Sequence, residues 1–110
     1  MSERSTAPAV RHPAGLLYGP AHVVVHANEP FRELFGAASA GLPAAEALLD
    51  LPHAAFELLD LVYREGRPLA VWIAMRGAEW RLTVAPRTDP GTGEVYGIAI
   101  HLVPRDSDRG

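Results

Sequence analysis

The sequence predicts an α+β fold in which several helices pack against one face of a five-stranded antiparallel sheet. Two short segments rich in β-branched and apolar residues come first, and segments with helical periodicity follow them. Three strand-like segments come last, separated by short turn-forming stretches, as in strands connected by hairpins. The 110 residues are enough for one hydrophobic core and too few for two.

The first two strands are expected at Leu16–Tyr18 and His22–Ala27, with a break at the Gly-Pro pair between them. Residues 1–14 show no periodicity and contain two prolines, which predicts a flexible N-terminal tail. Residues 105–110 are polar and predict a C-terminal tail, so the folded domain is expected to span residues 15–104.

Asn28 is predicted to mark the start of the first helix. It is the only Asn in a sequence without Gln or Lys, and it separates a β-branched run from an amphipathic one. Its side-chain oxygen suits the free N–H groups of a helix N-terminus, and Glu29 and Pro30 suit the first turn. The apolar face of this helix and the left-handed glycine expected to end it are Phe31, Leu34, Phe35 and Gly36.

Two further helical stretches are expected. Residues 37–51 predict one or two short helices, because Gly41 and Pro43 interrupt the stretch. The longest helix is expected from Pro52 to about Glu65, ended by the glycine that follows. Its apolar stripe consists of Phe56, Leu59, Val62 and Tyr63.

The last three strands are expected at residues 69–76, 80–85 and 95–103, with turns at 77–79 and 89–94. Alternation assigns one face of the first of these strands to the core, namely Leu69, Val71, Ile73 and Met75. The opposite, outer face then carries Ala70, Trp72, Ala74, Ala99, His101 and Val103. An outer face this apolar predicts an interface, so we expect a homodimer packed through Trp72, His101 and Val103.

These motifs, in this order, resemble a PAS domain over about residues 16–104. Around the first helix the resemblance rests on Ala-Asn, then an acidic-Pro-aromatic run, then Leu-Phe-Gly, all within residues 27–36. Later parts of the resemblance are Tyr-Arg-Glu-Gly-Arg-Pro at 63–68, the strand from Glu79 to Pro86, and the turn at 89–94. The run Gly-Pro-Ala-His before the second strand is similar to PAS domains at the front of bacterial sensor kinases and phosphatases.

The resemblance implies a small sensory or interaction module, often dimeric, with an apolar cavity between the sheet and the helices. The side chains expected there either line a pocket or fill a close-packed core, and we expect a mostly filled core with room for a small apolar ligand. These residues are Phe31, Phe35, Phe56, Leu59, Val71, Ile73, Trp80, Leu82, Ile98 and Ile100.

No cofactor and no metal ion are expected. The sequence has no Cys, so it lacks the cysteine motif of the flavin photoreceptors in this family and any Cys-based zinc site. His22 and His26 are expected to be edge or surface residues, roughly 13 Å apart on one strand and too distant to share a metal ion. His53 begins the long helix, which is a poor position for the axial ligand that this helix carries in haem-binding PAS domains.

Composition argues against several classes of function. The net charge is −3 and the ten Arg residues are scattered, so no nucleic-acid surface is expected. No apolar run approaches the roughly 20 residues that span a membrane and no secretory signal stands at the N-terminus, so a cytoplasmic protein is expected. The sequence has neither Lys nor Cys, no serine in a nucleophile-elbow pattern and no carboxylate pair in an apolar strand context, so no catalytic residue is identified.

We therefore expect a non-enzymatic PAS-type sensor or protein-interaction domain in bacterial signal transduction. Its expected partners are a second copy of the chain, a small apolar ligand, and a kinase, phosphatase or other effector. The final strand ends at Pro104 without the family's Asp-Ile-Thr link, so the sequence does not specify the output. Two alternatives remain open: a cone-shaped α+β enzyme or binder, which needs a carboxylate or His deep in its cavity, and a purely structural dimerisation module.

Overall fold

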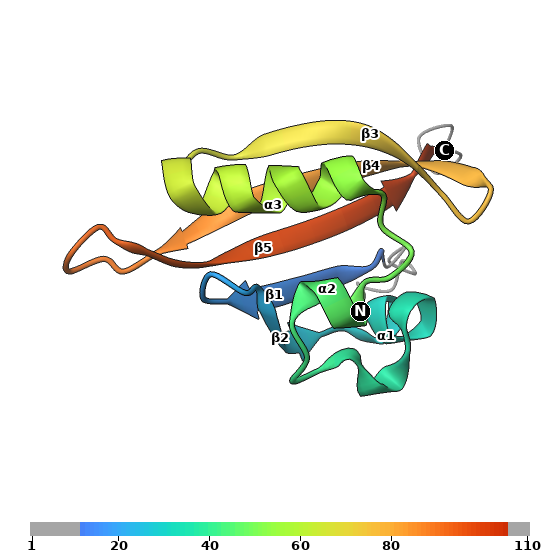
Figure 1. The fold of residues 1–110 in the computed structure, drawn as a ribbon, viewed down its shortest axis with the longest axis horizontal. Helices are drawn as coiled ribbons and strands as arrows, with labels where there is room; N and C mark the ends of the chain where they lie inside the picture. Colours follow the sequence, from blue (N-terminus) through green and yellow to red (C-terminus); the bar gives the residue numbers. More distant parts are fainter. Residues whose placement is uncertain (1–11, 106–110) are drawn as a thin grey trace, which may run out of the picture.

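A computed structural model describes residues 12–105 of the chain. Its strands are β1 (Ala14–Tyr18), β2 (Val23–Ala27), β3 (Leu69–Met75), β4 (Ala78–Thr88) and β5 (Val95–Pro104). They form one antiparallel sheet in the order β2-β1-β5-β4-β3, so the first hairpin joins the last three strands through the β1–β5 pair (Figure 1). The predicted five-stranded α+β layout is confirmed.

The helical layer comes between β2 and β3 in the sequence. It consists of α1 (Glu29–Phe35), the short 3-10 helix η2 (Ala37–Ser39), α2 (Ala44–Ala47) and α3 (His53–Glu65). The long helix α3 packs against β5, β4 and β3, whereas α1 lies against β1 and α2 against β2 (Figure 1). The prediction of one or two short helices over residues 37–51 is confirmed by η2 and α2.

The folded part of the chain begins slightly earlier than expected. β1 starts at Ala14, and the Leu102 N–H donates to the Pro13 carbonyl at 2.9 Å. Ala14 therefore belongs to the sheet, and Pro13 is hydrogen-bonded to β5. The remaining predicted tail segments, 1–11 and 106–110, lie outside the described residues.

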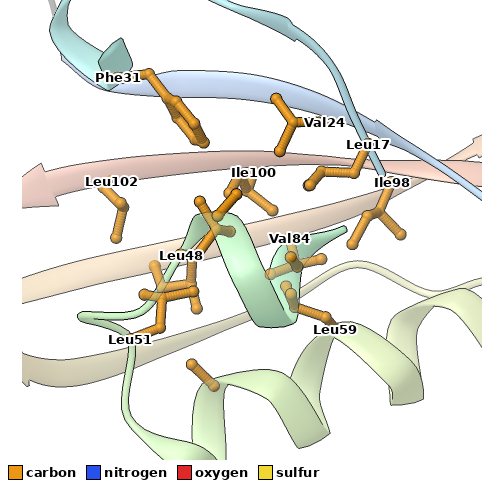
Figure 2. Close-up of a cluster of buried hydrophobic side chains, with 14 of the residues drawn as sticks. Leu17, Val24, Phe31, Leu48, Leu51, Leu59, Val84, Ile98, Ile100 and Leu102 are labelled. Atoms are coloured by element: carbon orange, nitrogen blue, oxygen red, sulfur yellow. The ribbon is translucent and has the colours of Figure 1, made fainter. Parts of the chain in front are cut away.

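The hydrophobic core lies between the inner face of the sheet and the helices. Figure 2 shows Val84, Ile98 and Ile100 of the sheet gathered around the same space as Leu48 and Leu59 of the helical layer. Burying a side chain of this size stabilises the fold by about 1.5–3 kcal/mol. The large side chains with essentially no exposed surface are Leu17, Val24, Phe31, Leu48, Leu59, Val62, Leu82, Val84, Ile98, Ile100 and Leu102.

The edge strand β3 departs from the prediction. Ile73 and Met75 are buried as expected, but Val71 is 39% exposed and Leu69 is exposed as well. β3 has a neighbouring strand on one side only, and α3 lies mainly over β5 and β4. The first half of β3 therefore extends past the helical cover, and the assignment of Leu69 and Val71 to the core is wrong.

Glycines end two helices in different ways. Gly66 ends α3 in the left-handed conformation at φ 71° and ψ 24°, as predicted. Gly36 ends α1 at φ 104° and ψ 142°, which is positive in φ but outside the left-handed helical region expected from the sequence. The β3–β4 turn consists of Arg76 and Gly77 instead of residues 77–79, and both have the positive φ that a two-residue type I′ turn requires.

Asn28 caps α1 as predicted, and it also ties the helix to the sheet. Its Oδ1 accepts hydrogen bonds from the Phe31 N–H at 3.0 Å and from the Ala14 N–H at 3.0 Å. Its Nδ2 donates to the His12 carbonyl at 2.9 Å. One carboxamide thus joins the start of α1 to the start of β1, which explains why an amide and not a hydroxyl stands here.

Replacing Asn28 with Ala is expected to lower the free energy of unfolding by about 2 kcal/mol, because the helix cap and two further hydrogen bonds are lost together. Asn28→Asp keeps both bonds accepted by Oδ1 and loses only the donor, so its loss should be clearly smaller. Urea unfolding followed by circular dichroism measures both variants. Equal losses, or a loss in the Ala variant below about 0.5 kcal/mol, would show that the carboxamide does not act as this joint.

Candidate functional site

The outer face of the sheet, which points away from the helices, is the first candidate site. Register places Trp72, Arg81 and Val103 in one row across β3, β4 and β5, with Thr83 and His101 in the next row. Trp72 is 47% exposed, and no helix within residues 12–105 covers this face. The structure thus places the three predicted interface residues Trp72, His101 and Val103 on one surface, and their role in an interface stays a prediction.

A hollow of about 480 Å³ crosses the outer face beside these rows. Its middle is the row formed by Leu16, Ala99 and Ala85, in which β5 and β4 contribute only a methyl group each. Short side chains flanked by longer ones leave a depression on a sheet surface. We call this hollow the sheet trough; it is lined by Ala14, Gly15, Leu16, His26, Asn28, Thr83, Ala85, Ala99, Ile100 and His101.

Most trough residues were not identified from the sequence. Outward alanines at positions 85 and 99 are visible in the alternation of each strand, but their alignment depends on the β4–β5 register. The participation of Leu16 and His26 depends in addition on the pairing of β1 with β5 and β2. The outward alanines are therefore the signal for the trough in the sequence. They indicate a hollow only when the register of the strands is known.

Trp72 stands at the border of this face, on the edge strand β3. The guanidinium of Arg105 lies over its ring, 5.4 Å from the ring centroid. Arg105 also pairs with Glu79 on β4. These two contacts hold a cation over one side of the indole and leave nearly half of the Trp72 surface exposed.

His101 lies at the trough beside a second histidine. Its ring meets the His12 ring edge-on, with the centroids 5.8 Å apart. Partial burial, with the nearby His12 as a smaller cause, lowers the pKa of His101 from its usual value of 6.5. The neutral ring is therefore favoured in the folded protein.

The ten residues predicted to face the space between sheet and helices form one region, with one exception. Phe31, Leu59, Ile73, Leu82, Ile98 and Ile100 are buried in the core cluster, and Phe35, Phe56 and Trp80 pack against it while partly exposed. The indole N–H of Trp80 donates to the Met75 carbonyl at 3.0 Å, which satisfies its only polar atom. Val71 lies on the uncovered part of β3 and does not belong to this cluster.

His22 is a residue that sequence reasoning misplaced. The sequence predicts an edge or surface residue, yet only 5% of His22 is exposed, and it lies in the β1–β2 turn with φ 55°. Its Nε2 forms a 2.7 Å hydrogen bond with Asp60 of α3, and its ring meets Tyr63 edge-on at 5.7 Å. The contact joins residues 38 positions apart, so no local pattern could have predicted it.

Metal-binding clusters and membrane-spanning helices are both absent from residues 12–105. These residues contain no group of three or more His, Asp or Glu side chains arranged to hold a metal ion. No helix in the same range is both long and apolar enough to cross a membrane. His53 is exposed at the first turn of α3, where its Nε2 lies 3.3 Å from Glu57.

No protein-family model matches this sequence, and no curated protein matches it either. Solved structures match over most of the chain. The PAS domain of the histidine kinase ThkA superposes with a TM-score of 0.67 at 16% identity, covering 84% of this chain and 99% of that one. A sensory box sensor histidine kinase from Vibrio cholerae gives a TM-score of 0.71 at 13% identity, covering 86% of this chain and 82% of that one.

A third similar structure is the complex of phage VqmA with DPO. Its TM-score is 0.68 at 27% identity, and the match covers 89% of this chain and 49% of that one, so the chain spans about half of that protein. The sheet order, the helical layer on one face and these superpositions agree. The chain has the PAS fold, as the resemblance implied.

Lowering the pH is expected to destabilise the domain through His101. Because the pKa of His101 is lowered in the folded state, the unfolded chain binds this proton more readily, and stability falls as the pH drops through 6.5. The loss of stability levels off once the pH is below the pKa of His101 in the folded protein. Urea unfolding at a series of pH values measures this, and His101→Gln should remove that part of the pH dependence. An unchanged profile in the variant would contradict the assignment.

Proposed function

We propose that the chain is a PAS-type sensor or protein-interaction domain of bacterial signal transduction that acts as a homodimer and has no enzymatic activity of its own. The observation that carries the proposal is the outer face of the sheet, which combines the exposed Trp72 with the sheet trough. Two of the similar structures come from histidine kinases, which supports a signalling role. A kinase, phosphatase or other effector is the partner class that follows.

The dimer proposal rests on the complementarity of a protruding ring and a hollow on one face. A twofold axis makes each copy present the same patch, so a projecting group on one copy meets a recess on the other. The trough has the size of pockets that accept a whole small molecule, and it can hold an indole. In this arrangement Trp72 of each copy enters the trough of its partner, between Leu16 and His101.

The chemistry of the two surfaces supports this pairing. Trp is among the residues most enriched at binding hot spots, because its large ring loses much exposed surface in a fitting recess. The trough floor around Ala85 and Ala99 is apolar, and the neutral His101 brings little charge to its rim. A charged side chain in place of the Trp72 ring would be buried in the sheet trough without a partner, which is unfavourable.

We also propose that a small apolar ligand binds between the sheet and the helices. The similar phage VqmA structure is a complex with DPO, which supports a ligand role for this fold. In this chain the residues at the centre of the core are buried. The ligand would therefore enter at the border of the core, where Phe35, Phe56 and Trp80 are partly exposed. A small ligand fits this proposal best, because an empty cavity costs about 24 cal/mol per Å³.

Location and remaining partners follow from the same proposal. We place the domain in the cytoplasm and assign it no nucleic-acid partner, because the net charge is −3 and Arg residues are scattered. One similar structure is a Vibrio cholerae VqmA–ligand–DNA complex, of which this chain covers 46%. Retention of a labelled duplex by the purified domain at physiological salt would overturn this part of the proposal.

Trp72→Arg is expected to dissociate the dimer. Loss of a hot-spot ring costs about 2 kcal/mol or more, so the dissociation constant should rise at least about 30-fold. Light scattering coupled to gel filtration at micromolar concentration measures it. Ala85→Arg, which fills the trough, should act in the same way.

The matched control for this experiment is Leu49→Arg, which puts the same charge on an exposed apolar residue of the helical side. Its dimer should be unchanged. A monomer at all accessible concentrations, or a dimer equally sensitive to all three substitutions, would contradict an interface on the outer face.

The freshly purified domain is expected to carry neither haem nor flavin, because it has no Cys and His53 is exposed at the start of α3. Its absorption spectrum should show no Soret band and no structured flavin bands. Native mass spectrometry of the same sample tests the apolar ligand through the added mass. Visible cofactor absorption would overturn the expectation.

A further inference from the structure

A second hollow lies on the helical side of the molecule, away from the sheet trough. Its volume is about 430 Å³, and its walls come from the end of α1, from η2, from α2 and the residues after it, and from the β3–β4 turn. This volume lies in the range of small-molecule sites. We call it the helical pocket; it differs from the space between sheet and helices, because no strand contributes a residue to its walls.

Ser39 gives the helical pocket an unsatisfied polar group. The residue lines the pocket and is only 3% exposed. Its hydroxyl oxygen is buried and has no hydrogen-bond partner within the described residues. Burying a hydroxyl without a hydrogen-bond partner is unfavourable, so a ligand atom that bonds to the Ser39 hydroxyl would recover part of that loss.

The charges around the pocket favour a cation. Arg76 is already committed, because its Nε lies 3.0 Å from the Asp50 carboxylate and its Nη1 donates to the Leu34 carbonyl at 3.0 Å. The Arg76 and Asp50 charges therefore offset each other. Glu33 and Glu46 also line the pocket and form no ion pair within residues 12–105. The pocket thus keeps an excess of negative charge.

The remaining wall is apolar. Phe35, Leu42 and Leu49 line it, and Leu49 is 76% exposed, the largest exposure of any large apolar side chain in the described chain. A large apolar side chain this exposed gains by contact with a ligand body, whereas it contributes nothing to the core.

We propose that the helical pocket binds a small organic ammonium ion with a short apolar body. The ammonium group donates a hydrogen bond to the Ser39 hydroxyl and lies within the field of Glu33 and Glu46. The apolar body lies against Leu42 and Leu49. The inference does not rest on the dimer proposal, because the two sites share no residue.

An NMR titration of the full chain tests this inference. The probe is n-butylammonium chloride, with sodium butyrate and n-butanol at the same ionic strength as matched anionic and neutral probes. The ammonium ion should produce saturable amide shifts confined to residues 33–50 and Arg76. Butanol should bind more weakly, and butyrate should produce no saturable shift.

Variants identify the groups that bind. The double variant Glu33→Gln, Glu46→Gln should weaken ammonium binding about fivefold or more, and Ser39→Ala about threefold or more. Glu94→Gln removes an exposed carboxylate on the distant β4–β5 loop and should leave binding unchanged. Each amide spectrum also reports whether the variant is folded, and if Ser39→Ala does not fold, the double variant decides.

Several outcomes would overturn the proposal. One is a shift that rises linearly without saturating, or that spreads over the whole surface. Another is butyrate binding as well as the ammonium ion. A third is equal weakening by Glu94→Gln and by the double variant. Dimer formation measured on the same samples shows separately whether the outer-face proposal holds.

Discussion

One-sided cover of the sheet is the constraint on which the rest of the structure depends. The inward side chains of β4 and β5, such as Leu82, Val84 and Ile100, gain their stability from contact with α3 and with the segment around Leu48. Between residues 12 and 105, five strands and fewer than 30 helical residues provide one such layer and no second one. The outward side chains of the same strands therefore face solvent in residues 12–105. A sheet that is half covered in this way has one face packed in the core and one face open to solvent, and the proposed dimer uses the open face.

The two ends of the helical layer show how the cover is held in place. At one end the Asn28 carboxamide joins α1 to the start of β1, and at the other the Arg76 guanidinium joins the β3–β4 turn to α1 and to Asp50. The His22–Asp60 hydrogen bond adds a third link, between the β1–β2 turn and α3. Each link connects a turn or a strand end to a helix, which fixes short helices that would not persist alone. No helix of the described residues packs over Trp72, Ala85 and Ala99 on the outer face, which is the surface that the proposed dimer uses.

The sequence predicted well the features that depend on neighbouring residues. The Asn28 cap, the left-handed Gly66 and the Asp89 turn, where the carboxylate accepts from the Gly91 N–H at 2.7 Å, are all set by a few adjacent residues. Features that depend on distant residues were missed. The exposure of Val71 depends on where α3 lies, the burial of His22 depends on α3 as well, and the sheet trough depends on the register of four strands. The candidate surface was therefore predicted in outline, through Trp72, His101 and Val103, whereas its hollow was not.

Disulfide trapping tests the central claim, that two copies meet through their outer faces, most directly. The chain has no Cys, so a single introduced thiol reports one contact without background. Ala74→Cys places a thiol beside Trp72 and keeps the ring, and Ala99→Cys places one in the trough. When the two variants are mixed and mildly oxidised, we expect a covalent heterodimer. The control mixture of Ala74→Cys with Leu49→Cys, which lies on the helical side, should form little covalent heterodimer. Equal trapping in both mixtures, or none in the first while the protein is dimeric, would contradict the account.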